Sequence, residues 1–430
     1  MFVLYNLLIA IFSPIWVPWM LLRTRKRKEK PNWAERQGDL TLSPRKDGDR
    51  IWVHAVSVGE VVAVTPILRE LRAKAPKLEI VLSVTTSTGH QTARERLDGL
   101  FDHLVYAPID VPRFTLRAMQ RAQPNVVAIM ETELWMNFLW AAKTFDVTTA
   151  LINGRISDRS FRRSTKIKFF YHALLRDMDE CLMQSELDAE RIRALGAGKV
   201  EVLGNCKFDQ AIDGLEADPA HWRKELGLSS SLPVVVVGST RGDMEPKFVV
   251  DALRRVGFDK VQVVHAPRHL ETADELERVV REAGGQVARR SRGETGSYLI
   301  LDTLGELSQV YSVADVAIIG GGFDKLGGQN LIQPLAHGVP VLHGPNMQNF
   351  RDVTAMALEA GASETCATEE ELAAALTRLL GDAGERAKRS AAAKSLVASN
   401  VGASARYAAR LVELVRANPR RPMKKSSSKT

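Results

Sequence analysis

The sequence predicts an α/β protein built from two doubly wound domains. Short apolar runs alternate with amphipathic helical segments from residue 51 to about residue 345, which is the rhythm of parallel βαβ units. The rhythm stops in a polar, acidic stretch after residue 209 and then restarts. A chain of 430 residues with 45% hydrophobic content has room for two domains of about 200 residues each.

The amino-terminal segment is expected to be a membrane anchor. Its first 22 residues carry no charged side chain, and the basic flank that follows favours a cytoplasmic location for the rest of the chain, against an anionic membrane surface. The positive start and small-residue cleavage site of a signal peptide are missing, so residues 1–30 are expected to be retained. Pro14 and Pro18 leave a second interpretation open, a helix that lies in the membrane interface. The flank consists of Arg23, Arg25, Lys26, Arg27, Lys28 and Lys30.

The first sheet domain is expected over residues 31–209 and the second over residues 210–418. Ligands of such sheets bind at the carboxyl ends of the strands, so we expect a site in a cleft between the two domains. A last helix is predicted at 404–417, and the polar tail, 419–430, cannot support a packed core. Strands are predicted at 51–56, 79–86, 103–108, 125–130, 148–152, 180–184 and 200–203, then at 232–239, 261–267, 298–302, 314–319 and 339–345.

Charge and cysteine content argue against two classes of protein. The net charge is +8, but much of the excess lies at the two ends and no basic face interleaved with aromatic residues is present. A nucleic-acid partner is therefore not expected. Cys181, Cys206 and Cys366 are far apart and form no CxxC pair, which argues against a disulfide framework and a zinc site.

The glycine-rich stretch from Ile318 to Phe350 is interpreted as a cradle for phosphate and sugar. It follows an apolar strand, and Gly320 to Gly322 let the backbone approach a ligand closely. Gly327 and Gly328 precede a helix start near Gln329 whose free N–H groups would face an anion. An ordinary glycine-rich turn is the alternative.

Two acidic motifs follow predicted strands. Glu60 enters a helix in its first turn, where the macrodipole favours a carboxylate that can accept a proton; the alternative is an ordinary first-turn glutamate. Glu131 and Glu133 lie at the carboxyl end of the strand before them. They could divide acid and base roles, or they could cap the next helix and pair with arginines.

Basic residues follow other strands. Lys207 closes the first domain and is placed to neutralise a phosphate or a carboxylate, unless it is a solvated linker charge. Arg268 follows a strand of the second domain and is a candidate for a phosphate fork. The segment from Leu304 to Leu307 could present backbone groups to a base, or it could be an ordinary helix start.

Several motifs, in this order, resemble the 3-deoxy-D-manno-octulosonic acid (Kdo) transferases of lipopolysaccharide synthesis. The resemblance runs from about Pro31 to Asp352 and extends to the anchor. It implies a GT-B fold of two Rossmann-like domains, an inverting and metal-independent reaction without a cofactor, and transfer of Kdo from CMP-Kdo to a lipid A precursor (lipid IVA) at the cytoplasmic face of the inner membrane. The motifs are HAVSVGE, TTSTGH, YAPIDVP, ETELW, NGRIS, GNCKFD, GST, PRH, DTLGEL, GGQN and GPNMQNF.

The resemblance also implies roles for individual residues. Glu60 resembles the general base, Glu131 a second essential carboxylate and Lys207 a transition-state stabiliser. The segments that resemble CMP-contacting ones comprise Pro267 and Arg268, then Leu304, Gly305 and Glu306, then Asn330, Leu331, Ile332 and Gln333.

The chain departs from the family pattern mainly on the donor side. Gln329 and Gln333 stand where the family usually has histidine and glutamate, and an amide offers hydrogen bonds without a full charge. Arg241 replaces a usual histidine, and Met136 a usual proline. Two rival hypotheses therefore remain: a GT-B enzyme with another nucleotide sugar, and a membrane-tethered binding protein that has lost catalysis.

Overall fold

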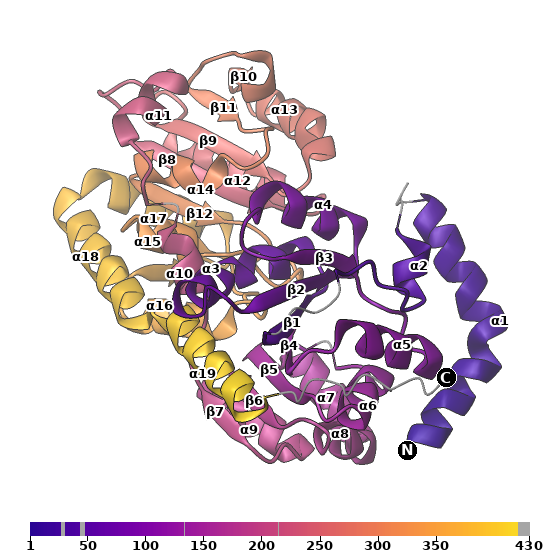
Figure 1. Cartoon of the computed structure of the whole chain (residues 1–430). Coiled ribbons are helices and arrows are strands. Elements are labelled where there is room, and N and C mark those ends of the chain that lie inside the picture. Colours follow the sequence, from indigo (N-terminus) through magenta and orange to yellow (C-terminus); the bar gives the residue numbers. More distant parts are fainter. Residues whose placement is uncertain (27–30, 44–47, 133, 214, 420–430) are drawn as a thin grey trace, which may run out of the picture. The chain divides into compact units, whose positions relative to one another are not determined.

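The computed structural model describes residues 1–26, 31–43, 48–132, 134–213 and 215–419 (Figure 1). The chain forms two compact units, one from Met1 to Gln210 together with the segment from Gly402 onward, and one from Ala211 to Val401. Each unit contains a seven-stranded sheet in which the paired strands run parallel. The predicted fold class, two doubly wound α/β domains, is confirmed. The expected tail and part of the basic flank lie outside the described residues.

Unit 1 is organised around a sheet with the strand order β3-β2-β1-β4-β5-β6-β7. The chain starts in the middle and winds to each edge in turn, which is the doubly wound arrangement. Strand β1 is fully buried because helices cover both faces of a parallel sheet. The strands are β1 (Arg50–Ala55), β2 (Glu79–Val84), β3 (His103–Tyr106), β4 (Val126–Met130), β5 (Thr148–Gly154), β6 (Glu180–Met183) and β7 (Val200–Val202).

Side chains of the preceding loops start several helices of unit 1. The Thr86 side chain accepts a hydrogen bond from the amide of Gly89, and α4 begins at Ser87; Ser185 caps α9 in the same way. The helices are α1 (Phe2–Lys26), α2 (Trp33–Arg36), α3 (Val58–Lys74), α4 (Ser87–Arg96), α5 (Pro112–Ala122), α6 (Met136–Thr144), α7 (Asp158–Lys166), α8 (Lys168–Leu175), α9 (Glu186–Leu195) and α10 (Lys207–Ile212).

The last helix, α19 (Ala403–Ala417), belongs to unit 1. Its position in the chain predicted that it belongs to the second domain, and that prediction is wrong. Tyr407 and Leu411 are fully buried in the same core as Val61 and Leu68 of α3. The apolar stripe of α19 is therefore satisfied by the first sheet, a long-range contact that chain order cannot reveal.

Unit 2 has the strand order β10-β11-β9-β8-β12-β13-β14. The three-residue strands β10 and β14 lie at the two edges and escaped prediction, because so few residues carry little apolar pattern. The strands are β8 (Val234–Thr240), β9 (Gln262–Pro267), β10 (Val287–Arg289), β11 (Tyr298–Ile300), β12 (Val316–Ile319), β13 (Val341–His343) and β14 (Ser363–Thr365). The helices are α11 (Pro219–Glu225), α12 (Glu245–Val256), α13 (Ala273–Glu282), α14 (Leu307–Val310), α15 (Ile332–Ala336), α16 (Arg351–Glu359), α17 (Glu369–Gly381) and α18 (Ala383–Asn400), with 3₁₀ turns η1 (Leu270–Thr272), η2 (Arg290–Arg292) and η3 (Tyr311–Val313).

Candidate active site

An ion pair joins two of the predicted site residues in unit 1. Glu131 follows β4, and Lys207 is the first residue of α10. The Lys207 Nζ atom donates to Glu131 Oε1 over 2.8 Å, and each side chain is only 19% exposed. Glu131 has a φ of +56°, a conformation that non-glycine residues seldom adopt and that persists only when the surrounding structure holds it.

Buried hydrogen bonds hold the segment before Lys207 against the sheet. The Cys206 thiol donates to the carbonyl of Ala63 on α3 over 3.2 Å, and the Cys206 amide donates to Asn153 Oδ1 over 3.2 Å. Asp209 accepts from the amides of Gly402 at 2.5 Å and Ser404 at 2.7 Å, where α19 begins. The position of Lys207 thus depends on α3, β5 and α19 together.

Glu60 lies in the first turn of α3, three residues before Ala63. Its Oε2 accepts from the amide of Val56 over 2.8 Å, and its Oε1 accepts from Ser57 Oγ over 3.3 Å. Strands β1 and β4 are neighbours in the sheet, so Glu60 and Glu131 follow adjacent strands. Unit 1 therefore places the three residues that resemble catalytic ones after the carboxyl ends of its strands, on the same side of the sheet. Glu133 lies outside the described residues.

A buried histidine beneath this edge was not among the predicted site residues. His54 is 1% exposed, its Nδ1 lies 2.8 Å from Ser83 Oγ, and that hydroxyl accepts from Trp52 Nε1 over 2.7 Å. The Ser83 hydroxyl thus links the Trp52 indole and the His54 imidazole in one buried hydrogen-bonded chain. Burial lowers the pKa of His54 to about 4. Its place in the HAVSVGE motif was the one signal in the sequence.

In unit 2, the predicted donor residues occupy three separate loops. Pro267 ends β9 and is buried, whereas Arg268 is exposed and only its amide is bonded, to the carbonyl of Thr240 over 2.9 Å. Within the described part of the chain the Arg268 guanidinium has no carboxylate partner. The guanidinium is thus available to an anion.

Glu306 is held by neighbouring donors. Arg290 Nη2 donates to Glu306 Oε1 over 3.0 Å, and the hydroxyl of Thr303 also bonds to this carboxylate. Burial raises the pKa of Glu306, but the bonds from Arg290 and Thr303 outweigh it and hold that pKa below its usual range. Leu304 is 81% exposed and Gly305 has a φ of +90°, so this turn projects toward solvent.

The third loop leads into α15. Asn330 Oδ1 accepts from the amide of Ile332 over 2.9 Å, and the side chains of Leu331 and Ile332 are fully buried. Gln333, which is half-buried, offers a polar side chain to a ligand. Within the stretch from Gln329 to Pro334, where a helix start was expected, α15 begins at Ile332, whose amide is already bonded.

The glycine-rich loop differs from the predicted phosphate cradle. Glu245, 1% exposed, accepts from the amides of Arg241 and Gly321 over 2.7 Å each and from that of Phe323 over 3.1 Å. A carboxylate of the protein thus takes the place expected for an anionic ligand at these amides. Burial raises the pKa of Glu245, and the three backbone bonds act against that shift. The close approach that requires the glycines is internal: a Cβ on Gly320 would lie 2.5 Å from the Ser239 carbonyl oxygen.

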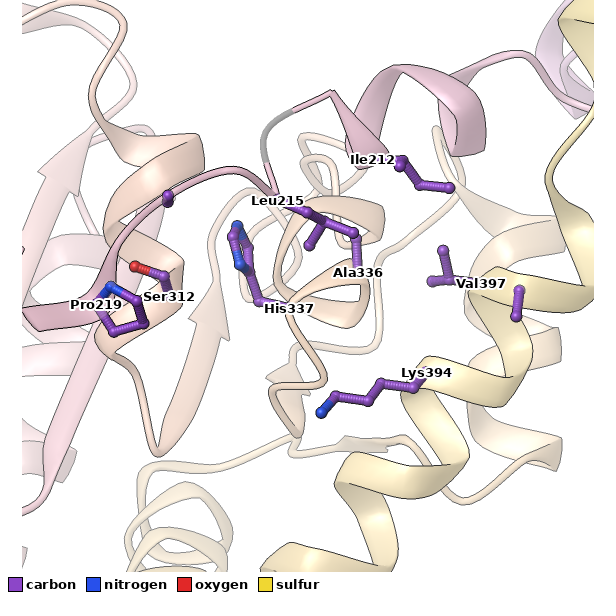
Figure 2. Close-up of a pocket in the computed structure, with 10 residues that line it drawn as sticks. Ile212, Leu215, Pro219, Ser312, Ala336, His337, Lys394 and Val397 are labelled. Atoms are coloured by element: carbon purple, nitrogen blue, oxygen red, sulfur yellow. The ribbon is translucent and has the colours of Figure 1, made fainter.

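A cavity of about 450 Å³ in unit 2 is separate from these loops (Figure 2). It lies between the chain before α11 and the helices α15 and α18, and the predicted site residues are not among those that line it. Its walls are mostly apolar, with His337 and Lys394 as the charged or titratable side chains. Among the described residues, no group of three or more His, Cys, Asp or Glu side chains is placed to hold a metal ion.

Comparisons with known proteins show the family of this chain. The family model of 3-deoxy-D-manno-octulosonic acid transferase (kdotransferase) matches residues 31–210. A curated 3-deoxy-D-manno-octulosonic acid transferase of Bordetella pertussis is 33% identical over 422 residues, which cover 94% of this chain and 96% of the relative. The chain belongs to the Kdo transferase family. This Kdo transferase is therefore a glycosyltransferase that transfers Kdo in lipopolysaccharide biosynthesis.

A second curated relative and a solved structure are also similar to this chain. The Kdo transferase of Haemophilus influenzae is 28% identical to this one over 415 residues, 93% of this chain and 95% of the relative. The solved structure of a glycosyltransferase from Rickettsia africae superposes with a TM-score of 0.62 at 12% identity and covers 88% of this chain and all of its own. At that identity the likeness concerns the fold alone, and the fold is GT-B.

Proposed function

We propose that this Kdo transferase moves Kdo from CMP-Kdo to a lipid A precursor, lipid IVA, with inversion at the anomeric carbon and without a metal ion or cofactor. The observation that carries the proposal is the Glu131–Lys207 ion pair, on the side of the unit 1 sheet where Glu60 lies in the first turn of α3. A base, a second carboxylate and a cation at one sheet edge provide the groups that such a transfer needs.

Glu60 would act as the general base. As the acceptor hydroxyl attacks the anomeric carbon, its proton passes to the Glu60 carboxylate, the new carbon–oxygen bond forms, and the bond to CMP breaks with both electrons leaving on the phosphate. The hydrogen bonds from Val56 and Ser57 fix the direction in which this carboxylate points. CMP is a good leaving group and needs little help from an acid.

Lys207 would balance the negative charge that develops as the bond to CMP breaks. Its ion pair with Glu131 keeps the ammonium in one place before the substrate arrives, so little reorganisation is needed during the reaction. On the donor side, the exposed guanidinium of Arg268 is suited to the phosphate of CMP. Glu306 and Gln333 offer acceptors to the sugar and base of the nucleotide.

The anchor gives the reason to place the reaction at a membrane. Of the described helices, α1 has the length and apolar composition to cross a bilayer, over Phe2–Leu22. The positively charged flank after it in the sequence favours the cytoplasmic face of the inner membrane. A lipid acceptor and an anionic surface would both be within reach of a protein held there.

The test is product formation with defined substrates. Purified full-length protein is incubated with CMP-Kdo and tetraacylated lipid A precursor, with and without EDTA, and the lipid is weighed by mass spectrometry and its new anomeric centre assigned by NMR. We expect Kdo addition with inverted configuration that survives EDTA. Glu60→Gln should lower the rate by about 10²-fold or more, whereas Glu70→Gln on the same helix should not. No product from CMP-Kdo would overturn the donor assignment.

Gln333 and Gln329 favour a second hypothesis, in which the donor is a nucleotide sugar other than CMP-Kdo. A transferase with the same unit 1 but a different nucleotide sugar would need a ribose and base pocket of other polarity, and these two amides lie where the family usually has histidine and glutamate. Competition of other nucleotide sugars with CMP-Kdo in the same assay distinguishes the two donors. A binding protein without catalysis is disfavoured, because a binder has no need of the base and the cation together.

A further inference from the structure

The helix α1 has two different faces in the structure, although its sequence carries no charged side chain up to Leu22. From Val3 to Leu22 the exposed face is apolar; Val3, Ile11, Ile15 and Leu22 on it are 78%, 58%, 69% and 57% exposed. The opposite stripe is partly covered along the whole helix, at spacings of three and four residues. It consists of Phe2, Tyr5, Asn6, Ile9, Ser13, Trp16, Val17, Met20 and Thr24, and the uncharged polar side chains of the helix all lie on it.

Polar contacts fasten the first turns of α1 to unit 1. The Tyr5 hydroxyl donates to Asp110 Oδ2 over 2.8 Å. Asn6 and Asn137 exchange two amide hydrogen bonds of 2.9 and 2.8 Å, and Asn137 is fully buried. The ring of Phe2 also lies 4.4 Å from that of Trp140 on α6. We call the Tyr5–Asp110 and Asn6–Asn137 contacts the latch.

The chain after α1 returns to the same loop that receives the latch. Arg36 on α2 donates to the carbonyl of Ala107 over 2.9 Å, and the amide of Ile109 donates to the carbonyl of Arg36 over 2.9 Å. If α1 crossed the bilayer with the latch closed, residues 27–32 would have to cross it again. That stretch contains Arg27, Lys28, Glu29 and Lys30, and each charge in the hydrocarbon costs about 2.5–3.5 kcal/mol or more. A latched α1 therefore cannot span.

A basic and apolar surface adjoins the latch. Phe170 on α8 lies 5.8 Å from the ring of Tyr5, and its neighbours Ile167 and Phe169 are 44% and 62% exposed. Exposed cations lie on α7 and α8, the helices on either side of Ile167, and none of them has a carboxylate partner within the ranges that the structure describes. This basic patch consists of Arg159, Arg162, Arg163, Lys166 and Lys168.

We propose that α1 lies flat in one leaflet of an anionic phospholipid bilayer, with its exposed face in the acyl region, the latch toward the protein, and the basic patch on the headgroups of the same leaflet. Apolar side chains beside unpaired cations match the boundary between acyl chains and anionic headgroups. The inference goes beyond the proposed function and does not rest on it, because membrane depth can be measured without turnover.

Depth along α1 separates a flat helix from a spanning one. Full-length Val3→Cys, Ile11→Cys and Leu22→Cys are spin-labelled, which is possible because the three native cysteines are buried, and are bound to sealed vesicles of equal parts phosphatidylcholine and phosphatidylglycerol. Depth is read from the ratio of oxygen to nickel-complex accessibility. We expect the three labels at one shallow depth and all reached by nickel complex added outside. A label at residue 11 near the bilayer centre, with residues 3 and 22 in opposite leaflets, would overturn the proposal.

Two further variants test the latch and the basic patch. Tyr5→Phe combined with Asn6→Leu removes the side-chain bonds of α1 to Asp110 and Asn137, and should let the label at residue 11 sink deeper; unchanged depth would refute the latch. The triple variant Arg162→Gln, Arg163→Gln, Lys166→Gln should bind phosphatidylglycerol vesicles at least about tenfold more weakly, since each surface cation near anionic lipid contributes on the order of fivefold. The control Lys77→Gln, Arg94→Gln, Arg96→Gln loses the same charge from elsewhere in unit 1, and an equal loss of binding there would refute the basic patch.

Discussion

Lys207 Nζ lies 2.8 Å from Glu131 Oε1, and this contact bridges the ends of two strands that are not neighbours. Glu131 follows β4 and Lys207 follows β7, while β5 and β6 lie between them in the sheet. Neighbouring strands are about 4.8 Å apart, so β4 and β7 are separated by roughly 14 Å, and the two side chains together reach across that distance. It brings together two motifs that are 76 residues apart in the sequence.

The first prediction concerns this pair. Lys207→Met should lower Kdo transfer by about 10²- to 10³-fold, the range for loss of one electrostatic stabiliser, and should leave CMP binding unchanged, because the predicted CMP contacts lie in unit 2. Steady-state kinetics and calorimetry check both. Lys143→Met is the matched control, since Lys143 forms a 2.7 Å pair with Asp179 in the same unit. If the Glu131→Gln, Lys207→Met double variant recovers transfer, the ion pair has only a structural role and the prediction that Lys207 stabilises charge in the reaction is wrong.

The second prediction concerns Glu245. Its carboxylate accepts from three backbone amides, and the amide of Glu245→Gln provides a single acceptor oxygen. Each buried donor left unpaired costs about 1–3 kcal/mol, so unit 2 should be destabilised by at least about that amount. Urea unfolding measures the loss, and hydrogen exchange should quicken at the amides of Gly321 and Phe323. The control is Glu275→Gln, because Glu275 is exposed on α13 and pairs with Arg278. This variant should change neither the unfolding free energy nor the exchange rates.

The third prediction concerns Gln333. If the donor is CMP-Kdo, a carboxylate here makes stronger hydrogen bonds to the ribose hydroxyls than an amide does, and Gln333→Glu should tighten CMP by about 1 kcal/mol. Calorimetric titration of CMP into both forms measures this. Gln309→Glu, an exposed position on α14, should leave the affinity unchanged. Weaker CMP binding by the Gln333 variant would favour a different nucleotide sugar.

The fourth prediction is a pH dependence of stability. His265 is fully buried between Thr240 Oγ1 at 2.7 Å and the Tyr298 hydroxyl at 2.6 Å, and burial lowers its pKa to about 3. An unfolded histidine titrates near pH 6.5, so between about pH 6.5 and 3 the unfolded state binds one more proton. Stability therefore falls as the pH falls through that window and is unaffected by this residue above about pH 7.

The measurement compares urea unfolding of unit 2 at pH 7.5 and pH 5. Between pH 7.5 and pH 5, the free energy of unfolding of His265→Gln should fall by about 2 kcal/mol less than that of the parent. This difference is the linkage of one proton over the roughly 1.5 pH units between the unfolded pKa of about 6.5 and pH 5. Because the two unfolding free energies of each protein are subtracted from one another, any loss of stability that the substitution causes at both pH values cancels. His269→Gln, at an exposed position beyond the same strand, should retain the parent's pH dependence; equal pH dependence in all three proteins would contradict the buried neutral imidazole.

The sequence alone predicted the two doubly wound sheets and most of their strands. Parallel strands covered on both faces are near-continuous apolar runs, such as Ile51–Val53 in β1 and Val234–Val237 in β8. It also predicted that Glu60, Glu131 and Lys207 lie at the ends of strands of one domain. Those are local properties, fixed by the order of apolar and polar residues and by the topology of a parallel sheet.

Only the tertiary structure decided which partners those residues have. It placed α19 on the first sheet, gave the amides of the glycine-rich loop to Glu245, and joined Glu131 to Lys207. It also distinguished two faces on α1, where the latch fastens Tyr5 and Asn6 of one stripe to unit 1. Apolar periodicity states that a side chain is buried but not against what, and a hydrogen-bond donor finds its acceptor only when distant segments have packed.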